Sequence, residues 1–307
     1  MLATPPSGAQ YEIRAGSQRA TIVEVGGGVR EYRAGDRPVL DPYPAHAMCD
    51  GARGTPLIPW PNRLADGAYR FDGTDFGAPL TEPDKHNAIH GFLRWRPWQV
   101  LEHQASRVMM GIRLHPLTGY PFSMDARVAY ELGDGGLVVA TTATNLGDRA
   151  CPYGAGQHPY LSPGGGRIDD CTLELGAATR IRTDNERQLP AGTAAVEGTD
   201  FDFRAGKRLG GQKLDTPFTD LARDDRGRAW ARLTAPDGSR VELWADRHHP
   251  VIEIYTGDTL TPSRRRRGLG TEPMTCPPNA FQSGEGLIRV EPGQSLTTTW
   301  GVRLCPA

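Results

Sequence analysis

The chain of 307 residues carries 35 basic and 36 acidic side chains, a formal net charge of −1 at pH 7. This balance argues against a nucleic-acid-binding or membrane-surface protein, because both classes show a basic excess. No apolar run approaches the roughly 20 residues that a membrane-spanning helix needs. Residues 1–10 have neither the basic nor the apolar region of a signal peptide, so we expect them to form a flexible lead-in.

The cysteines are odd in number and widely spread, and no two of them form a C-x-x-C pair. Their spacing argues against a zinc ribbon or a redox motif. We therefore expect free thiols in a reducing compartment, which predicts a cytoplasmic protein. The five cysteines are Cys49, Cys151, Cys171, Cys276 and Cys305.

Short β-branched or alternating runs, each closed by a turn, recur along the chain. In the run 126–132, apolar Ala126, Val128 and Tyr130 alternate with other residues, which is typical of a half-buried strand. The segment 236–239, Pro-Asp-Gly-Ser, supplies the turn chemistry of a hairpin. The predicted strands are Thr21–Val25, Val108–Leu114, Ala126–Leu132, Leu137–Asn145, Thr172–Leu175, Ala229–Thr234, Val241–Ala245, Val251–Tyr255, Leu287–Val290 and Ser295–Leu304.

The same pass along the chain shows no apolar stripe that extends over three or more helical turns. Short strands with frequent turns predict an antiparallel β-sandwich or barrel. No linker, charge block or fixed-period repeat marks a boundary, and folds of this class can exceed 200 residues in one domain. The sequence therefore predicts a single all-β domain over residues 1–307.

Polar residues capable of chemistry gather in five segments beside prolines, glycines and aromatics. A lone histidine such as His158 is more often structural than catalytic, and a lone glutamate such as Glu272 is more often a surface charge. Because functional residues on a β-scaffold usually lie on loops, we expect these segments to be loops. The segments are Trp60–Arg63, His90–Phe92, Gln157–Tyr160, Leu214–Phe218 and Glu272–Phe281.

Two other sequence patterns, a histidine pair and a run of arginines, are weaker evidence for a functional site. His86 and His90 have the spacing of a helical metal site, but Asn87 stands where a zincin motif has glutamate and no third ligand is visible. We therefore expect no metal. The run Arg264 to Arg267 is expected to be a solvated loop, since a single basic run on a neutral protein seldom marks a nucleic-acid site.

Taken in order, the five segments resemble the aldose 1-epimerase (galactose mutarotase) family, from about Ile22 to the C-terminus. The resemblance implies the family's large antiparallel β-sandwich, the galactose mutarotase-like supersandwich. Gln157 stands where the galactose enzymes usually have asparagine, and the Glu272 segment is similar to that of a bacterial subgroup, so the preferred sugar stays open. The matching pieces are Asn62–Leu64, Gly67–Gly73, Ile89–Phe92, Gly156–Leu161, Ile254–Asp258, the Glu272 segment and Leu287–Gly293.

Mutarotation needs a base for the anomeric hydroxyl proton and an acid for the ring oxygen. Glu272 is the expected base, because a carboxylate is ionised at neutral pH when its pKa stays near about 4.3. His158 is the expected acid, since imidazole titrates near about 6.5, and a nearby carboxylate should favour its charged form. The resemblance assigns the same two roles.

The resemblance also implies a set of sugar-binding residues. His90 and Arg63 would hydrogen-bond the ring oxygen or nearby hydroxyls, and Asp215 would accept hydrogen bonds from hydroxyls. Asn62 and Tyr255 complete the set, although Tyr255 could equally be a core residue. The expected partner is a monosaccharide, with no cofactor, metal, nucleic acid or membrane, and the expected state is a monomer or homodimer.

Three alternatives stay open. A glycoside hydrolase would pair two carboxylates, for instance Glu272 and Asp215, across a glycosidic bond. A sugar-binding protein could retain the fold without catalysis, since fold does not guarantee function. An epimerase of a phosphorylated or otherwise anionic sugar would keep the chemistry and bind the anion through Arg94, Arg96 or the run Arg264 to Arg267.

Overall fold

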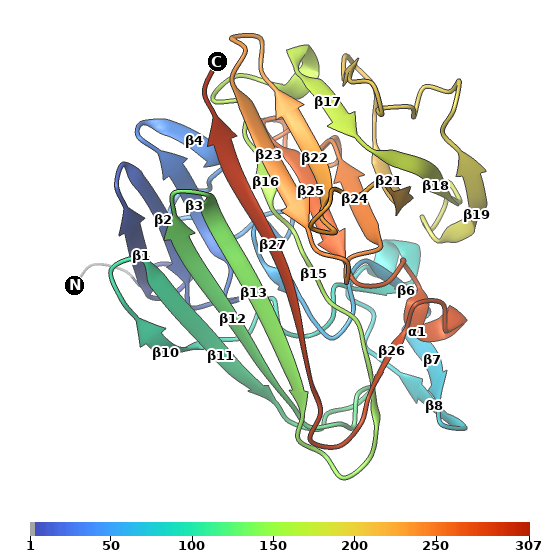
Figure 1. Cartoon of the computed structure of the whole chain (residues 1–307). Helices are drawn as coiled ribbons and strands as arrows, with labels where there is room; N and C mark the ends of the chain where they lie inside the picture. Colours follow the sequence, from blue (N-terminus) through green and yellow to red (C-terminus); the bar gives the residue numbers. More distant parts are fainter. Residues whose placement is uncertain (1–3) are drawn as a thin grey trace.

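Strands make up almost all of the regular structure in the computed structural model, which describes residues 4–307. Two large sheets, of twelve and nine strands, form the body of the protein (Figure 1). Every strand pair within them is antiparallel. The predicted all-β class and its large antiparallel sandwich are confirmed.

The twelve-stranded sheet carries most of the residues predicted to form a site. Its middle strands come from distant parts of the sequence, and two short strands, β15 and β5, lie off the main path. The spatial order is β1 (Gln10–Ala15), β2 (Gln18–Val23), β3 (Val29–Ala34), β4 (Arg37–Leu40), β16 (Tyr160–Leu161), β25 (Leu269–Met274), β24 (Val251–Tyr255), β21 (Asp215–Leu221), β18 (Ala177–Thr183) and β19 (Pro190–Ala195), with β15 (Gly156–Gln157) and β5 (Pro56–Leu57) beside β25.

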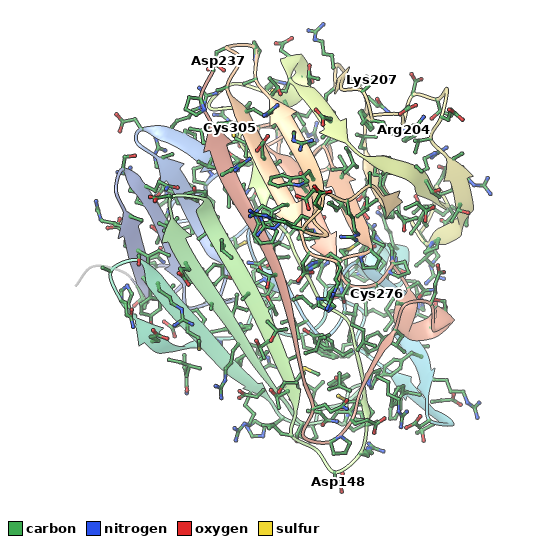
Figure 2. All side chains as sticks on the ribbon, viewed as in Figure 1. Asp148, Arg204, Lys207, Asp237, Cys276 and Cys305 are labelled. Carbon is green, nitrogen blue, oxygen red and sulfur yellow. The ribbon has the colours of Figure 1, made fainter. Side chains whose placement is uncertain are left out.

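The nine-stranded sheet contains the long final strand β27, which lies between β13 and β23 (Figure 1). At one end of this sheet, Asp237 of the β22–β23 turn lies near Cys305, the last residue of β27 (Figure 2). The spatial order is β10 (Gln99–His103), β11 (Arg107–Leu114), β12 (Met124–Gly133), β13 (Gly136–Asn145), β27 (Ser295–Cys305), β23 (Arg240–Ala245), β22 (Ala229–Thr234), β17 (Thr172–Leu175) and β20 (Lys207–Arg208).

The remaining elements are short. Among residues 4–307 the one α-helix has four residues, and no helix is long and apolar enough to cross a bilayer. The three two-stranded sheets pair β14 (Cys151–Tyr153) with β26 (Ile288–Val290), β6 (Arg63–Ala65) with β9 (Asn87–Ile89), and β7 (Ala68–Phe71) with β8 (Thr74–Gly77); the helices are η1 (Pro83–Lys85), η2 (Ile168–Asp170) and α1 (Ala280–Ser283).

All ten predicted strands are present, with ends that shift by a few residues. These strands could be predicted because apolar residues alternate along them. In β12 every second residue is buried, which is the pattern of a strand with one face on a core. The turn 236–239 joins β22 to β23 as predicted. It is closed by a 2.8 Å hydrogen bond from the backbone N–H of Ala235 to the carbonyl of Ser239.

The expected flexible lead-in differs from the structure over residues 7–10, while residues 1–3 lie outside the described part of the chain. The Ser7 carbonyl accepts a 2.9 Å hydrogen bond from Val25, and the Ala9 carbonyl accepts one of 3.0 Å from Glu24. Strand β1 already begins at Gln10. These backbone hydrogen bonds extend the edge of the twelve-stranded sheet and hold the segment in place.

The two large sheets meet across a buried core in which polar contacts are few and specific. The Gln157 amide of β15 donates to the Tyr130 hydroxyl of β12 at 2.9 Å and accepts from the Trp300 indole of β27 at 3.3 Å. The Tyr130 hydroxyl in turn donates to the Gly27 carbonyl at 2.7 Å. Gln157, adjacent to the candidate acid His158, therefore links the sheets rather than lining a cavity.

Candidate active site

Four neighbouring strands of the twelve-stranded sheet, β16, β25, β24 and β21, form the floor of a cavity of about 420 Å³. The structure brings all of the predicted site residues to this cavity. His158 precedes β16, Glu272 lies within β25, Tyr255 ends β24 and Asp215 begins β21. The seven predicted residues that line it are Asn62, Arg63, His90, His158, Asp215, Tyr255 and Glu272.

The expectation that these segments are loops is wrong for several of them. Glu272 lies in the interior of a sheet, opposite Glu253 of β24. The segment of β25, Leu-Gly-Thr-Glu-Pro-Met, hides its strand character because glycine and proline are both unusual inside strands. Arg63 likewise begins a strand, β6, which pairs with β9.

His158 is held by backbone contacts on both sides. Its carbonyl accepts a 2.8 Å hydrogen bond from Gly54, and its N–H donates to the Thr55 carbonyl at 3.2 Å. Position 54 needs glycine, because φ is +69° and a Cβ there would lie 1.9 Å from the Val29 carbonyl oxygen. The hydrogen bonds to residues 54 and 55 thus fix the position of the His158 backbone in the cavity wall.

The two predicted catalytic residues are in contact. His158 Nε2 lies 3.1 Å from Glu272 Oε1, and both side chains are almost fully buried. Glu272 Oε2 is also buried, and it has no hydrogen-bond partner among residues 4–307. Glu272 therefore has one oxygen engaged by the imidazole and a second oxygen available to a ligand.

Burial changes the protonation expected for this pair. It lowers the pKa of His158 to about 3, with a further lowering from the positive charge of Arg53. Burial also raises the pKa of Glu272 well above its usual range, and the Asp215 carboxylate adds to this. Desolvation therefore outweighs the nearby carboxylate and disfavours the charged form expected for His158.

The Tyr160 ring contacts both His158 and Arg53. Its ring stacks on the His158 imidazole with centroids 4.9 Å apart and planes within 7°. The Arg53 guanidinium lies 3.9 Å from the centroid of the same Tyr160 ring. A fixed cation behind the stacked rings disfavours a second positive charge on the imidazole.

His90 is fixed by the backbone of Asn62. The Asn62 N–H donates to His90 Nδ1 at 3.1 Å, so a neutral His90 carries its proton on Nε2. Burial lowers the pKa of His90 well below its usual range, with a further contribution from His158, so the ring is neutral. His90 is therefore a hydrogen-bond donor to the cavity rather than a proton-transfer group.

The ligand atoms of His90, His158 and Glu272 lie within 4.8 Å of one another, which is compatible in distance with a metal ion. The hydrogen bond from Asn62 to His90 Nδ1 opposes such a site. A metal-bound histidine normally donates its second ring N–H to an acceptor, whereas here the second nitrogen is itself the acceptor. The donor set fits a hydrogen-bonding ligand better than a cation.

Arg63 is the centre of an ion-pair cluster at the cavity wall. Its Nε donates to Glu82 at 2.9 Å, and its Nη2 lies 3.4 Å from Asp215 Oδ2. The guanidinium thereby orients both carboxylates, and Asp215 keeps further lone pairs for hydroxyl donors. Lys85 of η1 also approaches Glu82, at 3.6 Å.

Sequence reasoning missed three residues of the site. Glu253 lies in a predicted strand, on the same face as Tyr255, and a carboxylate at the centre of an apolar strand was the available signal. Arg94 was considered only as an anion ligand, and it lines the cavity. Nothing in the sequence marked Glu82, whose position depends on the pairing of β6 with β9 and the turn that precedes β9.

The run Arg264 to Arg267 does not line the cavity. Arg264 pairs with Asp41 at 3.2 Å, and buried Arg266 pairs with Asp169 at 2.5 Å. The expected solvated loop is therefore wrong for these two arginines, because each neutralises a carboxylate of another segment.

Comparison with known proteins identifies a family. A family model for aldose 1-epimerase matches residues 9–303. The uncharacterized protein YihR of Escherichia coli (strain K12) is 36% identical over 291 residues, covering 94% of this chain and 91% of YihR. The aldose 1-epimerase of the same organism is 26% identical over 239 residues, covering 72% of this chain and 66% of that enzyme.

Solved structures show the same fold. A GalM/aldose epimerase homologue from C. elegans has a TM-score of 0.86 at 18% identity, over 97% of this chain and 99% of the other. The galactose 1-epimerase of Lactobacillus acidophilus NCFM has a TM-score of 0.78 at 20% identity, over 95% and 92%. Because the family model spans nearly the whole sequence, this chain belongs to the aldose 1-epimerase family.

Proposed function

We propose that the protein is a mutarotase that interconverts the α and β anomers of a free aldose by acid–base ring opening and reclosure. The observation that carries this proposal is the buried contact of 3.1 Å between His158 Nε2 and Glu272 Oε1. The second oxygen of Glu272 lacks a partner within residues 4–307, and an anomeric hydroxyl would supply one.

The pair needs one shared proton to work. In the resting state Glu272 holds this proton and His158 is neutral. Transfer of the proton across this 3.1 Å contact gives a carboxylate and an imidazolium with no change in total charge. The Glu272 carboxylate then removes the proton from the anomeric hydroxyl, and the imidazolium of His158 protonates the ring oxygen as the ring C–O bond breaks.

Reclosure reverses these transfers on the other face of the aldehyde. After ring opening Glu272 carries the anomeric proton and His158 is neutral. Rotation about the C1–C2 bond presents the opposite face of C1. The attacking hydroxyl returns its proton to His158, and Glu272 returns a proton to the new anomeric oxygen, which leaves a carboxylate and an imidazolium. Return of the proton from His158 to Glu272 then restores the resting state.

The remaining cavity residues would hold the sugar. His90 donates through Nε2 to a sugar oxygen, and Asp215, oriented by Arg63, accepts from hydroxyls. Tyr255 and Asn62 complete the lining. Such matched polar contacts are required because an unpaired buried hydroxyl is costly. The five free thiols support a reducing, cytoplasmic location.

One observation favours a second candidate, an anionic aldose. Of the cations that line the cavity, Arg63 and Lys85 are occupied by Glu82, whereas the Arg94 guanidinium has no carboxylate within ion-pair distance in the described part of the chain. Burial lowers the pKa of Arg94, as expected for a cation without a counter-ion. A carboxylate, phosphate or sulfonate group on the sugar would supply that counter-ion.

The test is polarimetry of freshly dissolved α-glucose and α-galactose, with wild type, Glu272→Gln and His158→Asn. The wild-type protein should accelerate equilibration of the anomers, and the catalysed rate should be about 10²–10⁴-fold lower in each variant. The double variant should lose little more than either single one, because the two residues act as a unit. Acceleration that survives both substitutions would refute the assigned pair.

Glucuronic acid and glucose 6-phosphate test the second candidate in the same assay. If the substrate is anionic, Arg94→Gln should raise KM for these sugars and leave neutral sugars little affected. Arg96→Gln is the matched control, since Arg96 is exposed and does not line the cavity. Release of the aglycone from a nitrophenyl glycoside would instead indicate a hydrolase, and binding without any acceleration would indicate a sugar-binding protein.

A further inference from the structure

Glu253 is a buried carboxyl group that the proposed proton transfers do not use. It lies at the middle of β24, and its residue is 1% exposed. In the register of β24 and β25 it is directly opposite Glu272. Residues opposite each other in an antiparallel pair have their side chains on one face, and like charges in such positions repel.

No cation in residues 4–307 forms an ion pair with Glu253. The charged groups that face it are Asp215 from β21, Glu272 from β25 and Arg63 from β6. Arg63 contacts Glu82 and Asp215 instead. Burial raises the pKa of Glu253 well above its usual range; the Asp215 carboxylate raises it further, as does Glu272 when it is ionised. Burial without a counter-ion therefore favours the neutral form of Glu253.

The hydrogen bond between Glu253 and Asn62 leads to the catalytic cavity. Glu253 Oε2 accepts from the Asn62 amide Nδ2 at 3.2 Å. The Asn62 Oδ1 accepts from the Arg63 N–H at 2.8 Å, and the Asn62 N–H donates to His90 Nδ1 at 3.1 Å. Asn62 itself has a left-handed backbone, with φ of 54°. Its side chain is thus held between Glu253 and the start of β6.

We propose that Glu253 is a positioning residue that acts as a neutral carboxylic acid, holding Asn62, and through it the donor tautomer of His90, without placing a second negative charge beside Glu272. A carboxylic acid suits this position because its carbonyl oxygen accepts from Asn62 while its hydroxyl can donate to a neighbouring carboxylate. The role in catalysis rests on the proposed mutarotase function, whereas the protonation state does not.

Two substitutions separate the possible roles. Glu253→Gln keeps the size, neutrality and acceptor oxygen of the protonated acid, whereas Glu253→Leu removes the acceptor. We expect Glu253→Leu to lower kcat by about 10²-fold, the usual cost of misplacing a binding group by about 1 Å. Glu253→Gln should restore most of this loss. Thermal unfolding of both variants controls for loss of the fold.

The pH profile of kcat/KM distinguishes a neutral Glu253 from an ionised one. If Glu253 is neutral, its replacement by glutamine leaves both apparent pKa values of the His158–Glu272 pair in place. If Glu253 is ionised in wild type, removal of its charge lowers these values by about one unit or more, as expected for coupled buried groups. Such a shift would overturn the proposal. So would a Glu253→Gln variant without activity, or a Glu253→Leu variant with full activity.

Infrared spectroscopy tests the protonation state without substrate. At about pH 7 the wild-type protein should show the carbonyl band of a protonated carboxyl group that Glu253→Gln lacks. Glu272→Gln identifies the separate band of Glu272. Absence of the Glu253 band overturns the proposal even in an active enzyme. An inactive wild type that retains the band would refute the mutarotase function and leave the protonation state of Glu253 standing.

Discussion

The backbone N–H of Asn62 donates to Nδ1 of His90 at 3.1 Å, and both residues have positive φ, 54° and 63°. The hydrogen bond joins two left-handed positions at one end of the β6–β9 ribbon, since Asn62 precedes β6 and His90 follows β9. It fixes which ring nitrogen of His90 bears the proton, and so makes that side chain a donor. The precision of this contact depends on backbone geometry that few residues tolerate.

This geometry predicts different results for two substitutions of Asn62. Asn62→Ala should destabilise the protein by about 1–2 kcal/mol, because alanine is disfavoured in the left-handed region. It should also reduce activity. Asn62→Gly should recover the stability, since glycine tolerates this φ, but not the contact of the side chain with Glu253. Chemical denaturation and polarimetry of both variants check this; equal stability of the two would contradict it.

The shared proton of His158 and Glu272 predicts a bell-shaped dependence of kcat/KM on pH. Activity should be highest when the pair holds one proton. It should fall in acid as pH approaches the lowered pKa of His158, about 3, because a second proton removes the base. It should fall in alkali as pH passes the raised pKa of Glu272, because His158 then has no proton to donate. An activity that rises steadily with pH would contradict the shared proton.

Burial of neutral His158 predicts a loss of stability in acid. Its folded pKa, about 3, is below the unfolded value of about 6.5, so the stabilisation is present above about pH 6.5. It is lost as pH falls through the window between the two values, by about 1.4 kcal/mol for each pH unit. The substitution His158→Asn removes this pH-dependent contribution to stability. Denaturation at about pH 7 and pH 4.5 should show a smaller acid loss in the variant; an equal loss would argue against a neutral His158.

The cluster around Arg63 predicts a large effect on stability. Arg63→Met should destabilise the protein by about 1–3 kcal/mol, because it leaves the half-buried carboxylates of Glu82 and Asp215 without their shared cation. Arg70→Met is the matched control: its pair with Asp75 is exposed and should contribute about 1 kcal/mol or less. Denaturation midpoints of the two variants measure the difference, and similar values would refute a buried cluster.

The fold was predictable from sequence where strands alternate. β12 and β13 bury every second residue, so the period of two is visible without a structure. β25 and β21 were not found, because Pro273 and Pro217 interrupt the pattern. These prolines lie within the sheet nonetheless, each opposite a residue of β24.

The candidate site was predictable only through the resemblance to a family. Single residues such as His158 and Glu272 carried little information, and their contact of 3.1 Å depends on pairing between β16 and β25. The protonation of the pair could not be predicted, because it follows from burial. Glu253 was hidden for a related reason: a strand pattern shows the face on which a residue lies, but not whether a counter-ion faces it.

The order of strands in the twelve-stranded sheet has a consequence for synthesis of the chain. β25 fits between β16 and β24, so its residues, 269–274, complete a wall begun by Tyr160 more than a hundred residues earlier. On a translating ribosome the cavity cannot close until this late segment has emerged. Until then β16 and β24 present unpaired edges, which are prone to association with other chains. The nascent protein therefore exposes the free edge of β16 while residues 162–268 are made, and that of β24 only while residues 256–268 are made.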